Sequence, residues 1–66
     1  MFKEIAALIY NETQGNIPLG IHIIKEQAAR LEEENAIPYD VAFKNLKREF
    51  FRLYYIRRKN EKDSKK

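Results

Sequence analysis

The chain has no cysteine and no tryptophan, and it contains only two glycines, two prolines and one histidine. Without cysteine there is no disulfide framework, no thiolate ligand for zinc and no thiol nucleophile. Two glycines are too few for the usual glycine-rich loop that surrounds a phosphate group. A 66-residue chain with so little chemistry is not expected to be an enzyme when it acts alone.

The remaining reactive side chains do not form a convincing site. His22 and Glu26 are four positions apart on one predicted helix face, but two ligands rarely hold a metal ion. We interpret His22 as a structural or surface histidine. Thr13 is predicted in a turn and Ser64 in a tail, so neither is placed beside a base that would activate it. The sequence therefore predicts no catalytic residue, no metal and no cofactor.

Long hydrophobic runs are also missing. The apolar patches are a few residues long, far below the roughly 20 residues that span a bilayer as a helix. The first residues, Met1 to Glu4, lack the basic start and apolar run of a secretory signal. We expect a cytoplasmic protein without membrane insertion.

Chain length limits the size of the core. A domain of this size buries only about 60% of its unfolded surface, and small domains usually need a disulfide, a metal or a partner subunit. Since the first two are not indicated, we predict self-association, with a homodimer as the simplest form.

Helical spacing and proline positions divide the chain into three predicted helices. The first extends from about Phe2 to Thr13, with Gly15 suited to a left-handed cap at its end. The second begins at Pro18, in the first turn of the helix, with Asn16 as a candidate N-cap. The third extends from about Tyr39 to Lys59. We expect an all-α, three-helix module.

The short connection around Ile37 and Pro38 predicts that the second and third helices form an antiparallel hairpin. Residues 1–59 would form a single helical domain. The polar tail, residues 60–66, is predicted to be disordered and basic. In the second helix the expected core positions are Ile21, Ile24, Ala28 and Leu31. In the third helix they are Phe43, Leu46, Phe50, Leu53 and Tyr54.

Charge is distributed very unevenly along the chain. From Lys44 onward there are ten Lys and Arg against three acids, a net charge of +7; residues 1–43 carry three against seven, a net charge of −4. The net charge of +3 therefore hides a strongly dipolar molecule. Such asymmetry favours an anionic partner, or pairing between opposite ends of two copies.

The third helix has more aromatic residues than a thin core needs. They can pack against a second subunit, contact another protein or stack on nucleic-acid bases. Our first hypothesis is a non-enzymatic regulatory or adaptor protein that dimerises through this helix and binds a protein partner. The predicted partner-binding residues are Phe51, Arg52, Tyr54 and Tyr55.

The alternative is a nucleic-acid-binding, transcription-regulatory protein that uses the basic side of the same helix. Lys and Arg side chains there would neutralise phosphates. The same residues could also be no more than a solvated face and a favourable helix end. The predicted nucleic-acid-binding residues are Lys44, Lys47, Arg48, Arg52, Arg58 and Lys59.

Overall fold

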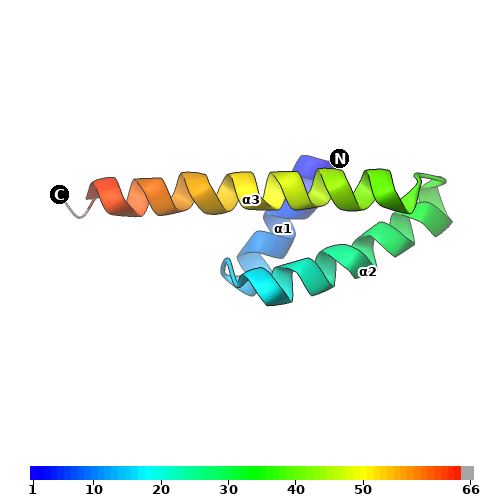
Figure 1. Cartoon of the computed structure of the whole chain (residues 1–66), viewed down its shortest axis with the longest axis horizontal. Coiled ribbons are helices and arrows are strands. Elements are labelled where there is room, and N and C mark those ends of the chain that lie inside the picture. Colours follow the sequence, from blue (N-terminus) through cyan, green and yellow to red (C-terminus); the bar gives the residue numbers. More distant parts are fainter. Residues whose placement is uncertain (65–66) are drawn as a thin grey trace.

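We describe the protein from a computed structural model, which places the backbone of residues 1–64 and the side chains of residues 1–59. It contains three helices: α1 (Phe2–Thr13), α2 (Ile17–Asn35) and α3 (Tyr39–Ser64). The predicted all-α, three-helix module is confirmed. Figure 1 shows α3 extending along the length of the molecule, with α1 crossing it and α2 diverging from it beyond their short connection.

The turn between α1 and α2 follows from its local sequence. Gln14 (φ 53°) and Gly15 (φ 78°) both adopt the left-handed conformation, so the cap that we expected at Gly15 begins one residue earlier. The side-chain oxygen of Asn16 accepts a hydrogen bond from the backbone N–H of Leu19 at 3.0 Å. Asn16 is therefore the N-cap of α2, as predicted, and Pro18 lies in its first turn.

The connection between α2 and α3 is equally tight. Ala36 ends α2 in a left-handed conformation (φ 55°), and the N–H of Ile37 donates to the carbonyl of Leu31 at 3.3 Å. A carboxylate oxygen of Glu32 accepts from the backbone N–H of Tyr39 at 3.1 Å. One acid of the Glu-rich end of α2 thus caps the first turn of α3, a role that the sequence analysis missed.

The core is small and lies where α3 packs against both other helices. Phe50, Leu46 and Ile24 are its largest fully buried side chains. Three of the remaining buried positions are alanines, whose small side chains allow neighbouring helices to approach closely. The buried hydrophobic residues are Ala6, Ile9, Ile24, Ala28, Leu31, Ala42, Leu46 and Phe50.

Several details of the prediction need correction. Leu8, which has the apolar spacing of the first helix, is 63% exposed, and α1 instead buries Ala6, Ile9 and Thr13. Thr13 ends α1, as the predicted helix range gave, and does not lie in the turn; its hydroxyl donates to the carbonyl of Ile9 at 2.8 Å.

The third helix is longer than predicted. Its backbone continues to Ser64 instead of ending near Lys59. Residues 65–66 and the side chains from position 60 onward lie outside the described part, so tail disorder stays a prediction. The antiparallel arrangement of α2 and α3 and the homodimer also stay predictions. Within the described residues no helix is long and apolar enough to cross a membrane.

Candidate binding surface on α3

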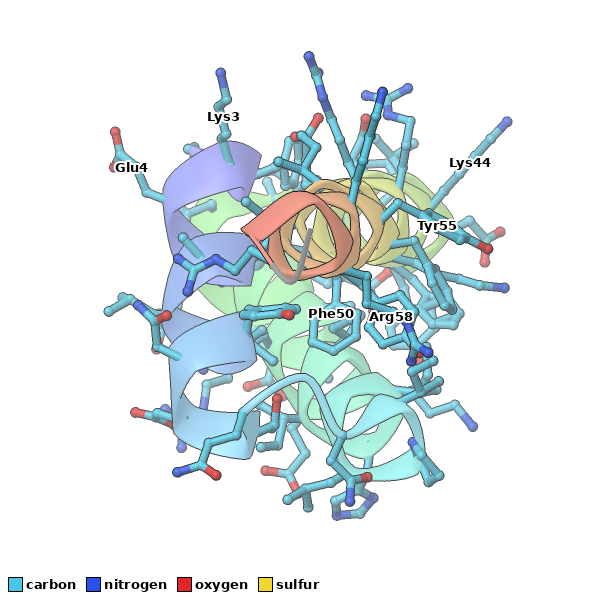
Figure 2. All side chains as sticks on the ribbon, turned by 90° about the vertical axis from the view of Figure 1, so that its left-hand side faces the viewer. Lys3, Glu4, Lys44, Phe50, Tyr55 and Arg58 are labelled. Atoms are coloured by element: carbon cyan, nitrogen blue, oxygen red, sulfur yellow. The ribbon has the colours of Figure 1, made fainter. Side chains whose placement is uncertain are left out.

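The residues predicted for binding share one side of α3. At about 100° per residue they occupy nearly half of the helix circumference, from Tyr54 beside the buried Phe50 to Lys59 and Arg52 on the opposite side. Figure 2 shows Lys44, Tyr55 and Arg58 on the side of α3 away from α1, with Phe50 pointing into the body of the protein. We call this surface the aromatic–basic face. It consists of Lys44, Lys47, Arg48, Phe51, Arg52, Tyr54, Tyr55, Arg58 and Lys59.

The aromatic residues of the face are graded in exposure. Phe51 is half-buried and meets the ring of Phe50 edge-on, with centroids 6.0 Å apart. Tyr54 is also half-buried. Tyr55 is 67% exposed and packs at 81° to the ring of Tyr54, with centroids 5.7 Å apart. The three rings therefore lead from the core to the solvent.

Arg58 fixes the middle ring of this series. Its Nη1 donates a hydrogen bond of 2.7 Å to the hydroxyl of Tyr54, and its guanidinium carbon lies 5.4 Å from the ring centroid. Both contacts restrict the side chain of Tyr54. Because Tyr55 packs on Tyr54, the most exposed ring rests on an ordered neighbour.

The cations of the face are exposed and poorly neutralised. Arg48 Nη2 donates to the side-chain oxygen of Asn45 at 2.7 Å, and its Nε is 3.9 Å from a carboxylate oxygen of Glu49. Lys47 Nζ lies 5.8 Å from the ring centroid of Phe43. Among the side chains of residues 1–59, that long Arg48–Glu49 contact is the only ion pair made by a cation of the face.

Two residues outside the predicted site join α3 to the end of α1. The guanidinium carbon of Arg57 lies 5.0 Å from the ring centroid of Tyr10. The Tyr10 ring in turn packs on Phe50, with centroids 5.6 Å apart. Arg57 is not among the predicted binding residues, although it lies in the same basic part of the chain. Its position seven residues after Phe50, on the same side of a helix, was the available signal.

The sequence pair His22 and Glu26 is in contact on the surface of α2. His22 Nε2 lies 3.0 Å from a carboxylate oxygen of Glu26, and both side chains are well exposed. Within the described residues no third His, Cys, Asp or Glu joins them in a group suited to a metal. The contact is that of an ordinary surface pair one turn apart.

We found no match to this chain among protein-family models, curated proteins or solved structures. The proposal below therefore rests on the chemistry of the aromatic–basic face.

Proposed function

We propose that the chain is a small, non-enzymatic, cytoplasmic regulatory or adaptor protein that binds a protein partner through the aromatic–basic face. One observation carries this proposal: Tyr55 is largely exposed and is supported by Tyr54, which Arg58 holds in place. A large ring ordered before binding loses little conformational entropy when a partner covers it. Tyrosine and arginine are also the residues enriched where protein interfaces are strongest.

The predicted residues divide into contact and support. Tyr55 and Arg52 are exposed and would make direct contact with the partner. Phe51 and Tyr54 are half-buried, so they would present one edge to the partner while anchoring the face to the core. The strongest contact is therefore expected around Tyr55.

Self-association is a second part of the proposal. The small core supports it, since the eight buried hydrophobic side chains among residues 1–59, three of them alanine, give limited stability. We propose that α2 and α3 act as an antiparallel hairpin and that α3 provides the contact between copies. Exposed Val41 and Ile56 add apolar surface along this helix.

Co-purification from the native cell tests the protein-partner proposal. The tagged chain is compared with Tyr55→Ala and with Leu8→Ala, which removes a similarly exposed apolar side chain from α1. We expect a partner that stays bound after nuclease treatment, is lost with Tyr55→Ala and is kept with Leu8→Ala. Loss of the partner on nuclease treatment would contradict the proposal.

The cations favour nucleic acid as a second candidate. Lys44, Lys47, Arg48, Arg52, Arg58 and Lys59 are exposed on one helix, with the aromatic rings between them. Surfaces that bind single strands combine such cations with rings on which bases stack. The salt dependence of binding separates this candidate from the first, because released counterions make nucleic-acid affinity fall steeply with salt.

A further inference from the structure

A hollow between the end of α1, the turn that follows it and α3 lies beside the aromatic–basic face. It has a volume of about 460 Å³ and is open to solvent. A second hollow of about 250 Å³ adjoins it, lined by Tyr10, Asn11, Gln14 and Arg57. The two hollows share Tyr10 and Gln14, and the guanidinium group of Arg57 lies over the Tyr10 ring. The first hollow is lined by Tyr10, Thr13, Gln14, Gly15, Asn16, Tyr54 and Arg58.

Hydrogen-bond donors dominate the larger hollow. Arg58 has five N–H donors and uses one on the hydroxyl of Tyr54, which leaves the hydrogen of that hydroxyl free to donate. The side-chain oxygen of Asn16 is occupied by the N–H of Leu19, so its NH₂ group is the part left for a ligand. The amide of Gln14 adds further donor capacity.

The charge of the site is positive. No Asp or Glu is among the described residues that line either hollow, while each hollow has one arginine. Thr13 offers little to a ligand, because its hydroxyl is buried and donates to the carbonyl of Ile9. A group with several anionic oxygens matches these donors best, since arginine pairs closely with phosphate.

The turn holds the walls of the hollow at a fixed distance. Gly15 has φ 78°, and a Cβ atom at this position would lie only 3.1 Å from the hydroxyl oxygen of Tyr10. Its N–H donates to the carbonyl of Tyr10 at 3.2 Å, which ties the turn to the end of α1. The site therefore depends on the folded turn and not on a flexible loop.

We infer that this hollow binds the phosphate group of a small phosphorylated molecule, with Arg58, Tyr54 and Asn16 as donors and Arg57 as a second cation beside Tyr10. The hollow is open to solvent and large enough for a phosphate group, while the rest of the ligand would extend toward the surface. The site shares Tyr54 and Arg58 with the aromatic–basic face, but Tyr55, the proposed centre of the partner contact, does not line it. Its existence does not depend on the function proposed above.

Two-dimensional NMR of the full chain tests this inference at constant ionic strength. The probes are inorganic phosphate, adenosine 5′-monophosphate, adenosine and acetate, added separately. We expect saturable shifts of the Gly15 and Asn16 amide signals with both phosphate-containing probes. Absence of saturation with both of them would overturn the inference. So would equal shifts with adenosine, which tests for ring contact alone, or with acetate, which tests for any small anion.

Three variants locate the binding group. Arg58→Gln should weaken phosphate binding about tenfold, and Tyr54→Phe about threefold, because charged hydrogen bonds contribute more than neutral ones. Arg30→Gln is the matched control, since it removes one exposed guanidinium from α2. The affinity of this variant for phosphate should equal that of the unchanged chain. If Arg58→Gln folds and binds phosphate as tightly as Arg30→Gln does, phosphate does not bind in the hollow lined by Arg58. If Arg58→Gln does not fold, Tyr54→Phe decides the question in the same way.

Discussion

Gly20 of α2 packs directly against the ring of Phe50 of α3. A Cβ atom at position 20 would lie 2.7 Å from Cε2 of the Phe50 ring and nearer still to Cζ. The ring is fully buried and cannot swing into solvent. Gly20 is therefore required for packing even though its backbone angles are ordinary for a helix.

Replacing Gly20 by Ala should lower the free energy of unfolding. In an open helix the same change would raise stability by about 1 kcal/mol. Here we expect a loss of about 1–3 kcal/mol, because the added methyl group overfills the core. Urea unfolding followed by circular dichroism measures the difference.

The double variant Gly20→Ala, Phe50→Leu is the control for this contact. A smaller side chain at position 50 should relieve part of the clash, so the two effects should not add. Strict additivity, or a gain in stability from Gly20→Ala alone, would contradict the packing described here.

Residue patterns predicted the polar ends of the helices better than the surface contacts. Asn16 and Pro18 predict the start of α2, because capping and the fixed φ of proline depend only on neighbouring residues. The spacing of Arg57 from Phe50 indicates its side of α3, but its stacking on Tyr10 depends on how α1 crosses α3, which spacing within one helix does not encode. Leu8 likewise has the spacing of an apolar helix face, and only the packing of α1 shows that it is exposed.

At the scale of the element, the backbone at the end of α2 is strained at Ala36, and a substitution there can relieve the strain. Ala36 adopts a left-handed conformation, which places the Cβ of an L-residue close to the backbone. Glycine avoids this contact and is the usual residue at such a position.

Ala36→Gly should therefore stabilise the protein by up to about 1 kcal/mol, with part of the gain offset by the greater freedom of glycine in the unfolded chain. Thermal or urea unfolding checks the sign. Ala29→Gly makes the same change at an exposed interior position of α2 and should cost about 1 kcal/mol. Two losses of equal size would show that the left-handed turn carries no strain.

The basic side of α3 leads to a prediction about salt. If duplex DNA binds there, the logarithm of the affinity should fall by about 0.9 per decade of salt for each phosphate neutralised. Replacing Lys44, Arg48 and Arg52 together by Ala should reduce the magnitude of this slope by up to the amount that about three phosphate contacts contribute. Fluorescence anisotropy over a salt series provides the measurement.

The matched control removes Lys3, Lys25 and Arg30, the three cations of residues 1–43. Net charge changes equally in both triple variants, but only one of them alters α3. Equal slopes would mean that binding follows overall charge and has no site on this helix. Duplex binding that remains tight near 0.2 M salt, where the Debye length is below about 8 Å, would place nucleic acid ahead of a protein partner.

At the scale of the whole molecule, the charge distribution limits how two copies can meet. A symmetric contact through the aromatic–basic face would place the cations of one copy near those of the other. Such repulsion weakens as salt screens it. A contact between the aromatic–basic face and an acidic partner instead becomes weaker as the salt concentration rises.

Sedimentation equilibrium at low and high salt therefore tests the mode of self-association. A dimer joined through the aromatic–basic face should become tighter as salt increases, and Tyr55→Ala should weaken it at every salt concentration. A dimer that dissociates with salt would instead indicate that opposite ends of two copies are paired. A monomer throughout the micromolar range would remove self-association from the proposal.

The single helix that contains both Phe50 and Tyr55 has a consequence for the lifetime of the protein in a cell. Phe50 closes the core and Tyr55 lies just over one turn further along the same helix. The binding face therefore disappears whenever the core opens, and a partner that binds only the folded state lowers the population of the open state. Proteases act on that open state. We expect the free chain to be degraded quickly and the bound chain slowly, so that its abundance follows the supply of its partner.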